Sequence, residues 1–104
     1  MKDTNALQSL SAMKRNSVKA EGMLKQLASS PRLMIMCTLV NGEKSVSELQ
    51  NNVDLSQSAL SQHLAKLRKA KLVASEKRGQ MVYYRLASME AQAILSTLYL
   101  VYCR

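Results

Sequence analysis

This chain of 104 residues contains few aromatic residues, little proline and few of the residues that build metal-binding or catalytic sites. Tryptophan and phenylalanine are absent, proline occurs once, and there is one histidine. A single histidine without nearby cysteines cannot complete a tetrahedral metal site. The sequence also contains no Cys-x-x-Cys pair, no glycine-rich phosphate loop and no Ser/His/Asp set that helical spacing would bring together. We therefore expect no metal, no cofactor and no enzyme activity, with a thiol oxidoreductase as the enzyme alternative.

Cysteines and long apolar runs are scarce as well. The two cysteines, Cys37 and Cys103, lie far apart in the sequence. In a reducing cytosol they are not expected to form a structural disulfide, although a transient redox pair is compatible with that compartment. No apolar run reaches the roughly 18 residues that cross a bilayer, and the polar residues 1–16 do not resemble a signal peptide. We expect a cytoplasmic protein with one domain over residues 1–104.

Positive charge is in excess. The chain has 15 Lys and Arg against 7 Asp and Glu, a formal charge of +8 and a pI near 9.8. This balance favours a polyanionic partner, either nucleic acid or an anionic membrane surface, although it would also fit an ordinary solvated surface. Because the cations cluster on and after one predicted helix, they favour DNA. The clustered cations are Lys66, Arg68, Lys69, Lys71, Lys77 and Arg78.

The segment from Leu55 to Val73 predicts one amphipathic helix with two chemically different faces. At about 100° per residue, Leu60, Leu64 and Leu67 form an apolar stripe that can dock on a core. The other side carries hydroxyls, amides and cations, which suit base edges and phosphates. His63, at the edge of the stripe, is expected to pack and hydrogen-bond locally rather than bind metal. The residues expected to contact base edges are Gln57, Ser58, Ser61 and Gln62.

Two helices are predicted before this segment. The first covers residues 5–28, with a candidate break near Asn16 and Ser17. The second begins at Ser30 as cap, has Pro31 as its first residue, and runs to the stop signal at residues 41–42.

A helix-turn-helix pair follows. Ser45 and Glu48 have the spacing of a capping box, which predicts a helix start. After a short turn, Ser56 is placed to cap the amphipathic helix. Residues 45–54 and 55–67 therefore predict a helix-turn-helix motif.

The remaining residues predict a hairpin and a last helix. Residues 72–77 and 80–86 have the β-branched and aromatic content of two strands, with a basic tip at Lys77 and Arg78 that should touch phosphate or minor groove. Ser88 then caps a helix over residues 89–104 that is apolar around most of its circumference, so it needs a partner on each side. Candidate residues for a two-fold interface are Leu7, Leu10, Leu98, Val101 and Tyr102.

The order of elements, the motif LSQSALSQHLAKLRKAKLV and the wing ending in VYYRL resemble the winged-helix ArsR/SmtB family of bacterial repressors. The segment PRLMIMCTL with Cys37, and the terminal VYCR with Cys103, resemble its HlyU/BigR/SqrR branch. This resemblance implies a mainly α dimer with a small β-hairpin wing. It also implies a repressor that senses sulfane sulfur or oxidants through the cysteine pair. The positions of the family's metal ligands read SELQNNVDL and MEAQAILSTLYL here, without Cys or His.

The two thiols also have a simpler interpretation. Cys37 lies among apolar residues and fits a buried small hydrophobe. Cys103 is next to the chain end, where termini are usually mobile and exposed, and it could resolve a modified partner thiol. The predicted function is a homodimeric repressor released from operator DNA by oxidation or persulfidation of Cys37 and Cys103. The alternative is an architectural or metal-independent DNA-binding protein of the same fold without a thiol switch. The inducer stays open among persulfide, disulfide and peroxide.

Overall fold

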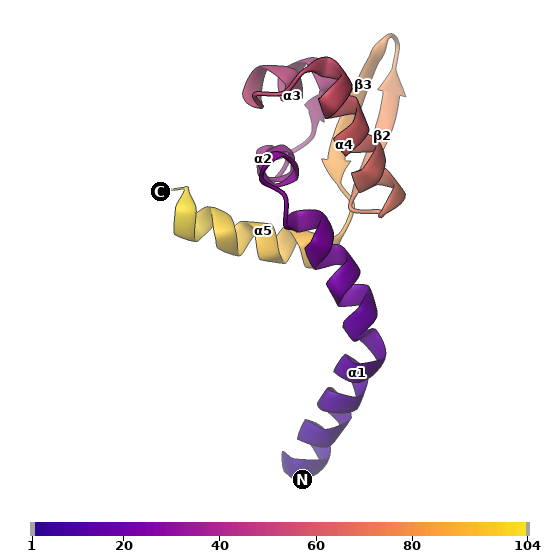
Figure 1. The fold of residues 1–104 in the computed structure, drawn as a ribbon, viewed down its shortest axis with the longest axis vertical. Coiled ribbons are helices and arrows are strands. Elements are labelled where there is room, and N and C mark those ends of the chain that lie inside the picture. Colours follow the sequence, from indigo (N-terminus) through magenta and orange to yellow (C-terminus); the bar gives the residue numbers. More distant parts are fainter. Residues whose placement is uncertain (1, 104) are drawn as a thin grey trace.

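A computed structural model describes the backbone of residues 2–103 and the side chains of residues 8–103. These residues form five helices and one three-stranded antiparallel sheet (Figure 1). This confirms the predicted mainly helical architecture with a hairpin. The elements are α1 (Lys2–Leu27), α2 (Ser30–Thr38), β1 (Lys44–Ser45), α3 (Val46–Asn52), α4 (Gln57–Lys69), β2 (Val73–Arg78), β3 (Met81–Leu86) and α5 (Met89–Tyr102).

The core lies where α2, α3, α4, α5 and the sheet meet. The predicted stripe of α4 is confirmed, because Leu60, Leu64 and Leu67 are at most 2% exposed. Burying an aliphatic side chain stabilises a fold by about 1.5–3 kcal/mol, so this stripe fixes which face of α4 remains outside. The other buried apolar residues are Leu27, Ile35, Met36, Leu39, Leu49, Val53, Leu72, Val73, Ala91 and Leu95.

Serine side chains cap the helix starts by accepting backbone N–H hydrogen bonds. The predicted capping box of α3 is confirmed: the Ser45 hydroxyl accepts from the Glu48 N–H at 3.1 Å, and the Glu48 carboxylate accepts from the Ser45 N–H at 2.9 Å. Ser56 and Ser88 cap α4 and α5 as predicted. The cap of α2 is Ser29, one residue before the predicted Ser30.

Two helices end earlier than predicted. Helix α2 ends at Thr38, not at residues 41–42, because the N–H of Leu39 already turns back to the Met36 carbonyl at 3.0 Å. Helix α4 ends at Lys69, and Lys71 adopts a left-handed φ of 62°. The N–H groups of Lys71 and Leu72 bond back to the carbonyls of residues 68 and 67, both at 3.0 Å. This pattern is a Schellman motif, and it directs the chain into β2.

The sheet has the order β1-β3-β2, and its first strand was not predicted. In β1, Lys44 pairs with Tyr84 and Ser45 with Tyr83. In the hairpin, Arg78 is the last residue of β2 and pairs with Met81, so it does not lie in the turn as predicted. Gly79 adopts a φ of 62° in the two-residue turn, which an L side chain rarely adopts.

Helix α1 projects away from the other elements and is continuous through Asn16, so the candidate break is wrong (Figure 1). From Gln8 onward, Leu27 is its only residue in the buried core, with Met23 packed against that core. Within residues 2–103, no helix has both the length and the apolar character needed to cross a membrane.

Candidate DNA-binding surface and thiol pair

The solvent-facing side of α4 carries the four residues that were predicted to contact bases. Their side chains are exposed and come from the first two turns of the helix; they are Gln57, Ser58, Ser61 and Gln62. The Ser56 hydroxyl accepts the N–H of Ala59 at 3.1 Å, and this cap fixes where the helix begins. With the leucine stripe buried on the other side, α4 is held as a rigid element that presents amides and hydroxyls outward.

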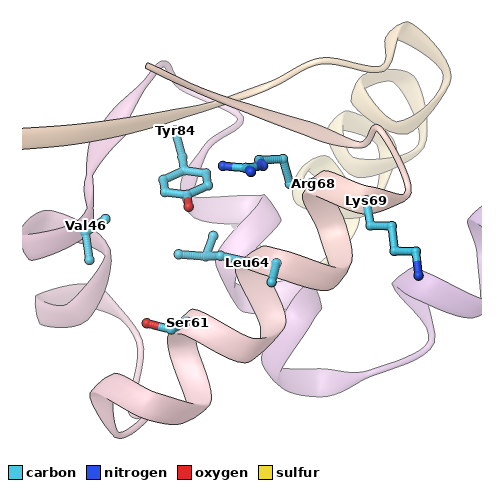
Figure 2. Close-up of a pocket in the computed structure, with 7 residues that line it drawn as sticks. Val46, Ser61, Leu64, Arg68, Lys69 and Tyr84 are labelled. Atoms are coloured by element: carbon cyan, nitrogen blue, oxygen red, sulfur yellow. The ribbon is translucent and has the colours of Figure 1, made fainter. Parts of the chain in front are cut away.

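A hollow of about 330 Å³ lies between α4, the start of α3 and β3. Figure 2 shows the Tyr84 hydroxyl pointing toward α4, with the Arg68 guanidinium extending to the same part of the hollow. The Ser61 side chain lines it as well, and Arg68 donates a hydrogen bond to the Ser75 hydroxyl of β2 at 3.1 Å. Tyr84 was missed as a site residue, because only the pairing of β3 with β1 and β2 shows which of its side chains face α4.

The end of α4 concentrates positive charge. Lys66, Arg68 and Lys69 lie in its last turn and are exposed. Cations at a helix C-terminus interact favourably with the helix dipole, so they do not destabilise α4. The predicted cations of the helix and its polar residues therefore form one continuous exposed surface.

The two basic residues of the wing point to opposite faces of the sheet, because side chains alternate along a strand. Lys77 is exposed and shares a face with Ser75, which bonds to α4 through Arg68. Arg78 lies on the other face and forms ion pairs with Glu43 and Glu76. The structure therefore groups Lys77 with the α4 surface and separates Arg78 from it. Glu43 was missed, because it is 35 positions away from Arg78.

His63 packs at the edge of the buried stripe of α4, as predicted. Its side chain is half-buried, and its Nδ1 atom has no hydrogen-bond partner among the described residues, so the expected local bond is not made through that atom. Burial lowers the pKa of His63, and the positive charges of Arg32 and Lys66 lower it further. Residues 8–103 hold no cluster of three or more His, Cys, Asp or Glu side chains arranged to bind a metal.

The two thiols lie on elements that pack together. Cys37 is on α2, half-buried against the core, and Cys103 is the exposed residue that ends α5. Both are free thiols. Burial raises the pKa of the Cys37 thiol, and electrostatic interaction with Cys103 raises it further. Because the thiolate is the nucleophile, Cys37 has less of the reactive form at neutral pH.

The element order and the exposed α4 surface match a known family. Residues 24–75, from the end of α1 into β2, match the family of bacterial regulatory proteins described as the arsR family. The chain belongs to the arsR family. It is therefore a DNA-binding transcriptional regulator with a helix-turn-helix motif. Membership in this family of regulators confirms the prediction that the protein is not an enzyme.

Individual arsR-family proteins are similar over nearly the whole chain. The transcriptional activator HlyU of Vibrio cholerae serotype O1 is 47% identical over 95 residues, which are 91% of this chain and 88% of the relative. The structure of reduced HlyU from Vibrio cholerae N16961 has a TM-score of 0.85 and 47% identity, and covers 89% of this chain and 98% of that chain. The structure of the transcriptional repressor BigR from Xylella fastidiosa has a TM-score of 0.83 and 34% identity, and the match covers 90% of this chain and 96% of that chain. The resemblance to the HlyU/BigR branch and the winged-helix fold are confirmed.

Proposed function

We propose that this arsR-family regulator is a homodimeric repressor that leaves its operator when Cys37 and Cys103 are oxidised or persulfidated. The observation that carries the switch is the placement of the two thiols. Cys37 lies on α2 and Cys103 at the end of α5, and these two helices pack against each other.

The exposed side of α4 is proposed to enter the major groove. Amides and hydroxyls near the start of a recognition helix can pair with base edges, and each good base contact discriminates by about 1–3 kcal/mol. In a dimer, two copies of α4 would occupy successive major grooves, with half-sites about 10 base pairs apart. The proposed base-contacting residues are Gln57, Ser58, Ser61 and Gln62.

The cations beside α4 are proposed to hold the phosphate backbone. A guanidinium and two hydroxyls line the hollow between α4 and β3, and these groups are suited to donate hydrogen bonds to a phosphate oxygen. Lys77 on the same side of the wing extends this surface toward the minor groove. The proposed backbone contacts are Lys66, Arg68, Lys69 and Lys77.

A second copy of the chain is proposed to cover the exposed apolar residues of α1 and α5. Leu10 is 62% exposed, Val101 is 56% exposed and Tyr102 is 79% exposed, whereas Leu98 is half-buried. The side chain of Leu7, another predicted interface residue, lies outside the described residues. Exposed apolar side chains on two projecting helices indicate a protein partner, and a two-fold contact between identical helices is the commonest closed assembly.

The thiol chemistry can be written as two steps. Cys103 is exposed, whereas burial raises the pKa of Cys37, so Cys103 is proposed to react first. With a persulfide donor, the Cys103 thiolate takes one sulfur atom and the donor leaves as a thiolate. The Cys37 thiolate then attacks the inner sulfur of the Cys103 persulfide, which forms the disulfide and releases hydrosulfide. With peroxide, Cys103 becomes a sulfenic acid, and attack by Cys37 releases water.

Such a bridge would reach DNA through the packing of the helices. Helix α2 contacts α3, α4 and α5, so a bond between α2 and the end of α5 constrains both the helix-turn-helix and the proposed dimer interface. A disulfide requires Cα atoms within about 7 Å of each other. If the resting distance is longer, either closure shifts α5 and changes the spacing of the two recognition helices, or extra sulfur atoms span the gap.

Intact-mass spectrometry of the protein after persulfide, disulfide and peroxide treatment tests the chemistry. We expect loss of two hydrogen atoms for a disulfide, or added sulfur for a longer bridge, together with release of operator DNA. Absence of any intramolecular bridge under all three treatments would contradict the switch and favour an architectural protein of the same fold. A promoter reporter tests the sign of regulation, because HlyU is named an activator and BigR a repressor.

A further inference from the structure

The wing carries an arginine that is bound on three sides. The Arg78 guanidinium donates to both carboxylate oxygens of Glu43, at 2.6 and 2.8 Å, and to Glu76 at 2.9 Å. The centre of the guanidinium also lies 4.6 Å from the centroid of the Tyr83 ring. Bidentate pairing and stacking both fix the orientation of a guanidinium, so Arg78 has a defined position on the sheet.

These contacts join the two edges of the sheet. Glu43 immediately precedes β1, Arg78 ends β2, and β3 with Tyr83 lies between them. The Arg78 side chain therefore crosses β3 and ties the tip of the hairpin to the chain segment before β1. A two-stranded hairpin alone is marginally stable, and β1 supplies only two residues of backbone pairing. The side-chain tie adds to the few contacts that fix the angle of the wing.

The same contacts remove Arg78 from the candidate DNA-binding surface. It lies on the face of the sheet opposite Lys77, while the face with Ser75 bonds to α4. Two carboxylates neutralise its charge. The hydrogen bonds from Arg78 hold the pKa of Glu43 below its usual range, so that carboxylate stays ionised at neutral pH. Three of the five N–H groups of the guanidinium are donated to these carboxylates, so a phosphate at Arg78 would compete with two bound anions.

We propose that Arg78 is a positioning residue, which braces the wing against Glu43 so that Lys77 meets the DNA backbone, and that it is not itself a phosphate contact. The inference rests on the proposed DNA-binding surface. It replaces the role that the sequence predicted for Arg78. Lys77 is then the charged wing residue that interacts with DNA, and the bond between Arg78 and Glu43 fixes the position of Lys77.

Charge-preserving substitutions separate a brace from a phosphate contact. Glu43→Asp keeps the net charge but shortens the carboxylate, and Arg78→Lys keeps the charge but loses the bidentate fork. The probe is a DNA duplex selected from a random library by the wild-type protein, and its affinity is measured across a salt series. Exposed ion pairs contribute up to about 1 kcal/mol, so each variant should bind about fivefold more weakly with an unchanged salt slope. The double variant should be no weaker than either single one.

Lys77→Ala is the matched control on the opposite face of the same strand. It should weaken binding and lower the salt slope by about 1, with an effect that adds to that of Glu43→Asp. Wild-type affinity for Arg78→Lys, together with a reduced salt slope for Arg78→Ala, would show a phosphate contact and overturn the brace. Tighter binding by Glu43→Asp would also overturn it.

Amide hydrogen exchange separates failure of the brace from failure of the DNA-binding proposal. In the absence of DNA, residues 73–86 should exchange about fivefold faster in Glu43→Asp and Arg78→Lys than in the wild type. Lys77→Ala should leave exchange unchanged. Unchanged exchange in both charge-preserving variants would overturn the brace even if DNA binding is confirmed. Faster exchange without selection of any duplex would support the tie and contradict the DNA-binding surface.

Discussion

Helices α4 and α5 are of similar length but differ in what they leave exposed. In α4 the leucines are buried, and the exposed side carries amides, hydroxyls and cations. In α5 only Ala91 and Leu95 are fully buried, and its last turn exposes Val101 and Tyr102. The two helices therefore call for different partners. A polar, basic face suits a polyanion, whereas an apolar one suits another protein surface.

The two helices also differ in what supports the partner assigned to each. Family membership establishes that α4 belongs to a DNA-binding regulator, and its exposed face is consistent with that role. The proposed partner of α5 is a second copy of the chain, and this rests on the exposed apolar residues alone. Substitutions on the exposed face of α4 should therefore change contacts with DNA and leave dimer formation unchanged. Substitutions on the exposed face of α5 should change dimer formation and leave the DNA-contacting side chains unchanged.

The largest effect is expected from a charge in the exposed apolar turn of α5. Val101→Asp would place a carboxylate in both halves of the proposed two-fold interface. Losing the burial of one aliphatic side chain costs about 1.5–3 kcal/mol per copy, so the dimer dissociation constant should rise by at least about a hundredfold. Sedimentation equilibrium measures this directly. Asn41→Asp adds the same charge at an exposed loop position and should leave assembly unchanged. A wild type that sediments as a monomer at micromolar concentration would refute the dimer.

An intermediate effect is expected from the exposed face of α4. Gln62→Ala should lower the discrimination between operator and random DNA by about 1–3 kcal/mol, the value of one good base contact, and alanine at all four polar residues should remove it. Assembly should be unaffected. Fluorescence anisotropy with both duplexes provides the measurement, and Asn41→Ala at an exposed loop position is the control. Equal operator affinity for the quadruple variant would show that α4 does not read bases. The substituted residues are Gln57, Ser58, Ser61 and Gln62.

The smallest effect concerns His63, which lies at the border between the two faces of α4. Its pKa in the folded protein is below the ordinary value of 6.5, so the unfolded chain takes up a proton first as the pH falls. Stability from the neutral imidazole is thus fully present above pH 6.5 and decreases below it. Urea denaturation at about pH 7.5 and about pH 5.5 should show a loss that His63→Gln reduces. Because His63 is the only histidine, an equal loss in both proteins would assign the pH dependence to other groups.

Much of the fold could be predicted because its signals are local. The caps at Ser45, Ser56 and Ser88 each depend on a residue three positions away, and the stripe of α4 depends on helical periodicity. The end of α4 was harder to predict. Glycine usually occupies the left-handed position after a helix, whereas here Lys71 adopts that conformation. The helix stops there because the N–H groups of the next residues satisfy its last carbonyls.

Long-range features could not be predicted in the same way. Strand β1 has only two residues, and it exists because β3 pairs with it. The bonds from Arg78 to Glu43 connect residues that the sequence separates widely, so the composition of the hairpin suggested a basic tip rather than a tie. For the thiols, the sequence predicted an exposed Cys103 correctly, whereas the half-burial of Cys37 depends on how α2 packs against the core.

The central claim is that the thiol pair controls the affinity of the α4 surface for operator DNA. The most direct measurement is operator affinity of the wild type, Cys37→Ser and Cys103→Ser before and after a persulfide donor. All three reduced proteins should bind equally. After treatment, the wild type should bind at least about tenfold more weakly, a change of about 1.4 kcal/mol, and recover with a reductant, while both serine variants remain bound. Release of either serine variant to the same extent as the wild type would contradict the account.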